Sequence, residues 1–241
     1  MKLKSKFIEL RGLRIHYLTG GHGVPLLYIP GWAVTAEMNR KIGELLAENY
    51  KLYIIDTPGD GKSDQFIGNW QFKDYVLVVK EFIKKLNLNN IILLGHSFGG
   101  AIAICLIANN PEIFSKVFLA NTIGITPDEV FMKYLKGRLK IEKNLSKILL
   151  DYIKNIFIPK FSDQLKALRI IKELYLSETI ERIEKKVIFL WAVNDHILSE
   201  NYKNKLLSKF KNVKLVDIEA ASHNMPILEP ERFVNYINYY D

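Results

Sequence analysis

The sequence predicts an α/β protein in which a mostly parallel central sheet is flanked by helices. Two patterns predict this class. Short apolar runs, typical of strands buried on both faces, alternate along the chain with longer segments of helical periodicity. Glycine, proline and single polar residues follow the ends of these runs. In a parallel sheet, the loops that follow the strands lie together at the carboxyl edge. We therefore expect a functional site at the carboxyl edge of the sheet.

Length and composition fit one large domain with an insertion. The chain has 241 residues, of which 49% are hydrophobic and 25% charged, so a sizeable core is expected. The single cysteine, Cys105, excludes an intrachain disulfide and a cysteine-based metal cluster. No run approaches the roughly 20 apolar residues of a membrane span, and the lysine-rich start lacks the apolar stretch of a secretion signal. We expect a cytoplasmic protein with no membrane span.

The first part of the chain predicts a hairpin followed by buried strands and helices. Residues 6–10 and 13–18 are expected to form antiparallel strands around a turn at Arg11-Gly12. The apolar runs at 25–29, 51–55 and 90–94 have the composition of buried strands. Helices are expected over residues 37–48, where Met38, Ile42, Leu45 and Leu46 share one face, and over residues 72–86.

The second part of the chain continues the same alternation around one insertion. Strands are expected at 116–120, 186–191 and 213–218, and helices at 202–210 and 230–239. Residues 126–182 are rich in lysine, isoleucine and leucine and lack buried strands. We interpret them as a helical lid inserted into a core made of residues 1–125 and 183–241. Within the lid, Phe131, Tyr152 and Phe157 are expected to line a substrate pocket.

One pentapeptide, placed between a predicted strand and a predicted helix, indicates a catalytic serine. Gly95-His96-Ser97-Phe98-Gly99 follows the strand at 90–94 and precedes an apolar helix rich in small residues. A strand, G-x-S-x-G and a helix form the setting of a nucleophile elbow. The turn is so sharp that glycines are needed two residues before and after the serine, where a Cβ atom would collide. Ser97 is left at the helix N-terminus, where developing negative charge is favoured.

A serine nucleophile needs a base, and the base needs an orienting acid. Of the five histidines, His223 lies in the loop directly after the strand at 213–218. Asp195 closes the strand at 186–191 and precedes His196. Asp217 lies within a strand, and Asp128 begins the lid. We expect Ser97, His223 and Asp195 to be nucleophile, base and acid.

The negative charge that develops on the substrate also needs two backbone N–H donors. One is expected from Phe98, which follows the nucleophile. The other is expected from Trp32, in the loop after the strand at 25–29. Both side chains would then line the acyl pocket.

These motifs resemble those of the α/β-hydrolase fold serine hydrolases along essentially the whole chain. The matching residues are Pro30-Gly31-Trp32, the turn from Asp56 to Ser63, the elbow around Ser97, then Asp195 and Ser222-His223. The order serine, acid, histidine is that of this family. Where the family commonly has His-Gly before the oxyanion residue, this chain has Pro30-Gly31. The resemblance implies a hydrolase that needs neither cofactor nor metal, and Ser97 stands where dehalogenases and epoxide hydrolases carry an aspartate.

The resemblance implies an ester hydrolase acting on a small acyl ester through an acyl-enzyme. The subgroup it resembles is the biotin-pathway esterase that cleaves pimeloyl-carrier-protein methyl ester, although its motifs are shared with many small esterases. Two alternatives stay open: a C–C bond hydrolase acting on a β-diketone, and a hydrolase fold that binds without catalysis. The sequence leaves the oligomeric state open.

The net charge of +8 is concentrated in one segment. Residues 133–172 carry eleven lysines and arginines against three acids. Such a segment is either a solvated helical face or a docking surface for an anionic partner. An acidic acyl carrier protein is the partner we expect in the second case, and we expect no nucleic acid.

Overall fold

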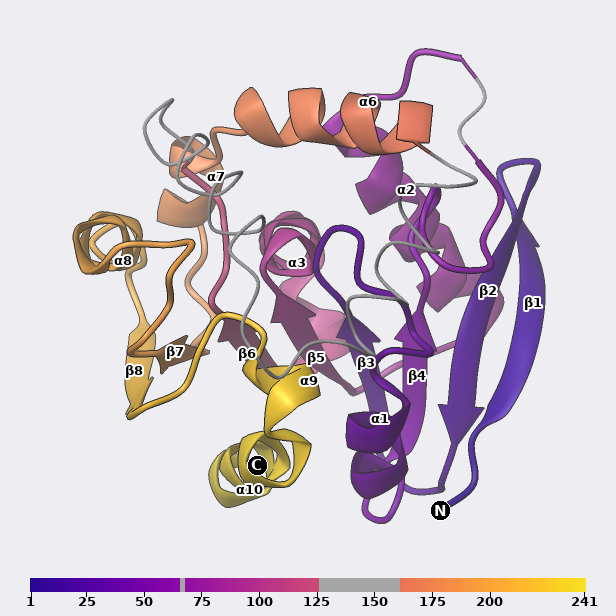
Figure 1. Cartoon of the computed structure of the whole chain (residues 1–241), viewed down its shortest axis with the longest axis horizontal. Coiled ribbons are helices and arrows are strands. Elements are labelled where there is room, and N and C mark those ends of the chain that lie inside the picture. Colours follow the sequence, from indigo (N-terminus) through magenta and orange to yellow (C-terminus); the bar gives the residue numbers. More distant parts are fainter. Residues whose placement is uncertain (66–67, 126–160) are drawn as a thin grey trace.

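A computed structural model describes residues 1–65, 68–125 and 161–241 (Figure 1). Its centre is an eight-stranded sheet in the order β1-β2-β4-β3-β5-β6-β7-β8. The strands are β1 (Lys4–Leu10), β2 (Leu13–Gly20), β3 (Pro25–Ile29), β4 (Lys51–Ile55), β5 (Ile91–His96), β6 (Phe114–Ala120), β7 (Val187–Ala192) and β8 (Val213–Ile218). β1 pairs with β2 and β2 with β4 in antiparallel fashion, and all other pairs are parallel. The predicted fold class is confirmed.

Helices cover both faces of the sheet, as Figure 1 shows for α1 and α10 on one side and for α2 and α3 on the other. The helices are α1 (Arg40–Leu46), α2 (Phe72–Lys85), α3 (Phe98–Asn109), α6 (Phe161–Lys172), α7 (Ser177–Glu181), α8 (Glu200–Leu207), α9 (Met225–Leu228) and α10 (Pro230–Tyr240), with a 3₁₀ turn at Pro111–Ile113. Parallel strands need crossover connections, and the helices supply them.

The strands are apolar on both faces because each face has its own core. In β3, Leu27 and Ile29 belong to the cluster on the α2 and α3 side. Leu26 and Tyr28, which alternate with them, belong to the cluster on the α1 and α10 side. Side chains that alternate with a period of two reach opposite faces, so a continuous apolar run is what a doubly covered strand requires.

Two helices, α1 and α8, differ from the sequence-based prediction by two or three residues at each end. The helix expected over 37–48 is helical only as α1, because Thr35 Oγ1 accepts the backbone N–H of Met38 and the Asn39 side chain donates to the Thr35 carbonyl. Such side-chain bonds compete with the first helical turn. The helix expected from residue 202 begins at Glu200, because Ser199 caps it by accepting the Tyr202 N–H.

The turn after β4 is organised around one buried carboxylate. Asp56 Oδ1 accepts the Ala36 N–H at 2.5 Å, and Oδ2 accepts the Lys62 N–H at 3.0 Å. Oδ2 also lies 2.6 Å from His16 Nδ1, and both side chains are fully buried. A Cβ atom at Gly61, whose φ is +47°, would lie 2.1 Å from Asp56 Oδ2, so this position requires glycine. Asp56 therefore ties β2, the loop before α1 and its own turn together.

The insertion is described only in its second part. Residues 126–160, with Asp128 and the three aromatic residues expected to line the pocket, lie outside the described residues. α6 and α7 follow, and Ile171, Leu174 and Ile180 are buried in the same apolar cluster as α2 and α3. The division into a core and a lid stays a prediction.

We predict that Asp56→Ala lowers the free energy of unfolding by about 3 kcal/mol, because it leaves buried N–H donors and His16 without their acceptor. Asp64→Ala, in the same turn, removes acceptors at the protein surface and should cost about 1 kcal/mol or less. Chemical denaturation of both variants measures the difference. Equal losses would contradict the organising role of Asp56.

Candidate active site

Ser97 lies at a strained turn between β5 and α3. Its φ of +52° and ψ of −116° are uncommon for a residue other than glycine. A Cβ atom at Gly99 would lie 2.1 Å from the Ile29 carbonyl oxygen, and one at Gly95 would lie 2.7 Å from the Gly100 Cα. The elbow therefore needs both glycines, because α3 approaches β3 and β5 more closely than a side chain allows.

The structure brings Ser97, His223 and Asp195 together in one hydrogen-bonded chain. His223 Nε2 lies 3.1 Å from Ser97 Oγ, and His223 Nδ1 lies 2.6 Å from Asp195 Oδ2. The carboxylate accepts the Nδ1 proton, so Nε2 is left with a lone pair for the serine hydroxyl. The three side chains come from the ends of β5, β7 and β8, although they are separated by up to 126 positions in the sequence.

The carboxylate of Asp195 is held on both oxygens. Oδ1 accepts the backbone N–H groups of Ile197 and Leu198 at 2.7 and 2.8 Å. Burial alone would raise the pKa of Asp195, but the charge and hydrogen bond of His223 and the two backbone donors outweigh it and lower that pKa. Asp195 therefore stabilises the fold above the pH at which an unfolded aspartate ionises, and that stabilisation is lost as the pH falls through the lowered pKa.

Asn121 is a site residue that the sequence analysis missed. It follows β6, and its Nδ2 donates to Asp195 Oδ2 at 2.5 Å while its Oδ1 accepts the Ala192 N–H at 3.1 Å. Its φ of +40° is tolerated by asparagine better than by most residues. The available signal was its position at the carboxyl end of a strand, next to the strand that carries Asp195.

His96 contacts the loop that carries His223 rather than Ser97. Its Nε2 lies 2.8 Å from the His223 carbonyl oxygen, so Nε2 donates. The two imidazole rings lie 5.1 Å apart, and a Cβ atom at Gly31 would lie 3.2 Å from His96 Nδ1. His96 thus packs between the His223 loop and the loop after β3.

The expected oxyanion donors are both buried: Trp32 lies in the loop after β3, and Phe98 is the first residue of α3. A Cβ atom at Gly31, next to Trp32, would lie 3.2 Å from Ser97 Cβ, so the loop after β3 lies directly against Ser97. The Phe98 ring meets Phe72 and Tyr75 of α2 edge-on, at centroid distances of 5.7 and 5.1 Å. The amino-terminal part of α2 therefore holds the side chain of Phe98, which follows Ser97 directly, in place.

The other candidates for the base and the acid lie elsewhere. His196 and His22 are exposed. Asp217 lies in β8 and pairs with Lys203 at 3.3 Å.

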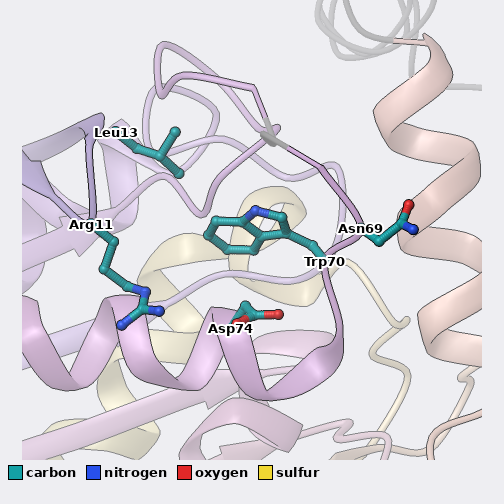
Figure 2. A pocket seen from close by; sticks show the side chains of 5 residues that line it. All are labelled: Arg11, Leu13, Asn69, Trp70 and Asp74. Carbon is teal, nitrogen blue, oxygen red and sulfur yellow. The ribbon is translucent and has the colours of Figure 1, made fainter.

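Two surface hollows border the amino-terminal end of α2. One, of about 360 Å³, is lined by Arg11, Leu13, Asn69, Trp70 and Asp74, with the Trp70 indole at its centre (Figure 2). The other, of about 520 Å³, runs between Trp70, Phe72 and the α6 residues Lys166 and Arg169. Ser97 lines neither, but Phe72 links the second hollow to Phe98.

Two further properties concern residues 1–65, 68–125 and 161–241. No group of three or more histidine, cysteine, aspartate or glutamate side chains in this part of the chain could hold a metal ion. None of the helices described is long and apolar enough to cross a membrane.

The fold and this arrangement of serine, histidine and aspartate define the class of α/β hydrolases. A sequence model of the alpha/beta hydrolase fold family matches residues 24–147. The chain belongs to this family.

Several relatives share most of the chain. An uncharacterized hydrolase of Bacillus subtilis (strain 168), YugF, is 24% identical over 92% of this chain and 91% of its own length. The 2-hydroxy-6-oxononadienedioate/2-hydroxy-6-oxononatrienedioate hydrolase 1 of Pseudomonas putida is 27% identical over 85% of this chain and 65% of its own length. The crystal structure of a serine hydrolase of carbazole degradation, CarC, aligns with a TM-score of 0.84 and 21% identity over 99% of this chain and 98% of that chain, a similarity of fold.

We predict that Asn121→Ala lowers kcat by about tenfold to a hundredfold and leaves KM nearly unchanged, because Asp195 loses one of its donors and misorients His223. The control is Asn109→Ala, because the Asn109 side chain donates to the Cys105 carbonyl oxygen within α3, away from Asp195. Steady-state kinetics on an aryl ester and thermal unfolding of both variants separate activity from stability. A folded Asn121→Ala variant with the wild-type kcat would show that the Ile197 and Leu198 amides suffice.

Proposed function

We propose that this protein is a serine hydrolase that cleaves carboxylic esters through an acyl-enzyme. The observation that carries the proposal is the hydrogen-bonded chain from Ser97 through His223 to Asp195, at a strained turn that precedes a helix. A serine in this setting is activated by its histidine for attack on a carbonyl carbon.

The proposed reaction has two halves. In the first, Ser97 Oγ attacks the ester carbonyl while His223 Nε2 takes the hydroxyl proton, and the resulting oxyanion is held by the N–H groups of Phe98 and Trp32. The carbonyl–oxygen bond of the leaving group breaks, and His223 returns the proton to the departing alcohol. In the second half, His223 Nε2 takes a proton from a water molecule as the water oxygen attacks the acyl carbon. The bond between the acyl carbon and Ser97 Oγ then breaks, His223 returns the proton to Oγ, and the acid is released.

A carbon–carbon bond hydrolase is the second candidate, and the Pseudomonas putida relative favours it. The substrate in that relative's name, 2-hydroxy-6-oxononadienedioate, contains no ester bond. The same three side chains would serve a β-diketone in this chain. A hydrolase fold that only binds its ligand would show no turnover on either class of substrate.

A finer proposal is that the ester is carried by an acidic acyl carrier protein, as for a pimeloyl-type methyl ester. The support is the basic segment 133–172. In its described part, Lys166, Arg169 and Lys172 are exposed on α6, and α6 borders the hollow that Phe72 links to Phe98. A basic surface beside the entrance would raise the rate of encounter with an anionic carrier.

We expect Ser97→Ala to abolish hydrolysis of p-nitrophenyl butyrate, and His223→Ala and Asp195→Asn to lower it by several orders of magnitude, because the three groups act as a unit. His196→Ala is the matched control, since His196 is exposed and follows Asp195 directly. A panel of aryl esters, acyl-CoA thioesters and a β-diketone separates the ester and carbon–carbon candidates. Activity within tenfold of wild type in a folded Ser97→Ala variant would refute the proposal.

For the carrier, we expect kcat/KM on a carrier-linked methyl ester to fall steeply as ionic strength rises from about 0.01 M to about 0.15 M, which shortens the Debye length from about 30 Å to about 8 Å. Hydrolysis of a neutral p-nitrophenyl ester should stay constant. Charge reversal at Arg169 and Lys172 should lower carrier turnover alone, and charge reversal at Lys80 and Lys84, exposed on α2, is the control. Equal salt responses of the two substrates would identify the basic segment as a solvated face.

A further inference from the structure

A second serine, histidine and aspartate are joined by hydrogen bonds at the β1 edge of the sheet. Ser5 Oγ lies 2.8 Å from His16 Nε2, and His16 Nδ1 lies 2.6 Å from Asp56 Oδ2. β1 is separated from β5, which carries the elbow, by three other strands, or about 19 Å at the usual strand spacing. These three residues are therefore distinct from the candidate active site.

The direction of the hydrogen bonds follows from the partners of Asp56. Both of its oxygens accept backbone N–H groups, from Ala36 and Lys62, so the carboxyl acts as an acceptor. His16 Nδ1 therefore donates to it, and His16 Nε2 keeps a lone pair that accepts the Ser5 hydroxyl. This is the same proton arrangement as at Ser97.

A nucleophile at the surface needs an accessible hydroxyl and a base that is held in place, and these three residues meet both needs. His16 and Asp56 are fully buried, so the ring is held in one orientation, whereas Ser5 is exposed. Phe7, which is 45% exposed, packs its ring 5.1 Å from the His16 ring, and the Arg14 guanidinium lies 4.7 Å above the Phe7 ring. An electrophile at Ser5 would thus meet an apolar ring and a positive charge.

We propose that Ser5 is a second nucleophile, a site at which the chain accepts an acyl or phosphonyl group from an activated donor such as an aryl ester or a fluorophosphonate. Ser5 Oγ bonds to the carbonyl carbon or the phosphorus, and its proton passes to His16 Nε2. The bond to the leaving group breaks, the leaving group departs with its electron pair, and His16 gives up the proton to it or to water. The product is an ester on Ser5.

Ser5 differs from Ser97 in what stabilises the next step. Ser97 precedes the N-terminus of α3 and lies against the glycine loop after β3, whereas Ser5 lies within a regular strand paired to Leu18. We therefore expect acylation of Ser5 without rapid hydrolysis of the adduct, so that Ser5 is modified once rather than turning over.

The test is the rate of labelling of individual serines in the full chain carrying Ser97→Ala. The variant is treated with a fluorophosphonate and, separately, with p-nitrophenyl acetate, and digested peptides are quantified by mass spectrometry over time. Ser115, exposed in β6, is the comparator, since its hydroxyl donates to the Asn90 carbonyl oxygen rather than to a histidine. We expect Ser5 to be labelled at least about a hundredfold faster than Ser115, the lower end of what a positioned base contributes.

Two controls complete the experiment. Adding Ser5→Ala should remove the fast labelling and leave the labelling of other serines unchanged. Unfolding the chain in guanidinium should lower the labelling rate of Ser5 to that of Ser115, because His16 lies beside Ser5 in the folded chain. Labelling of Ser5 in the folded chain no faster than that of Ser115 would overturn the proposal. The result is independent of the catalytic role proposed for Ser97, because that role is judged from the turnover of ester substrates. If Ser97 had no such role, the wild-type chain would be labelled fast at Ser5 and not at Ser97.

Discussion

The close approach of α3 to the carboxyl ends of β3 and β5 is the constraint on which the rest of the site depends. The backbone at Gly99 comes so near the Ile29 carbonyl that no side chain fits between them. That contact forces the helix to begin directly after Ser97 and forces Ser97 into a strained conformation. Packing in two apolar cores fixes the sheet and thereby holds the strain in place. The packing that stabilises the sheet therefore also sets the backbone geometry of Ser97.

Patterns local in sequence predicted most of the fold, and the chemistry of the elbow predicted the residues that meet in the candidate site. The apolar runs at 25–29, 51–55 and 213–218 coincide with β3, β4 and β8, because a strand buried on both faces must be apolar throughout. Ser97, His223 and Asp195 could be chosen because each directly follows a strand. Asn121 follows a strand too, but asparagine is common in turns, so its residue type gave no chemical signal.

Other contacts could not be predicted because they depend on strand order. His96 was visible only as a neighbour of Ser97, and its bond to the His223 carbonyl exists because the loops after β5 and β8 meet. Ser5, His16 and Asp56 come together because β2 lies between β1 and β4 in the sheet. The periodicity of apolar residues predicts the strands but does not predict their order in the sheet. The charge of the basic segment 133–172 could likewise be counted from the sequence, but the acidic carrier expected for it stays a prediction.

The open sides of the sheet have a consequence for how copies of this chain behave when concentrated. β1 and β8 are the edge strands among the strands that the structure describes, and the outer side of an edge strand is open to pairing with another strand. Lys4 and Lys6 are exposed along β1, and Lys214 is exposed on β8. Two copies that met at their β1 edges would bring the ammonium groups of Lys4 and Lys6 together. On β8 the exposed Asp217 offsets Lys214, so this repulsion is confined to the β1 edge. Like-charge repulsion at β1 therefore disfavours β-aggregation between copies, whatever the chemistry of either serine.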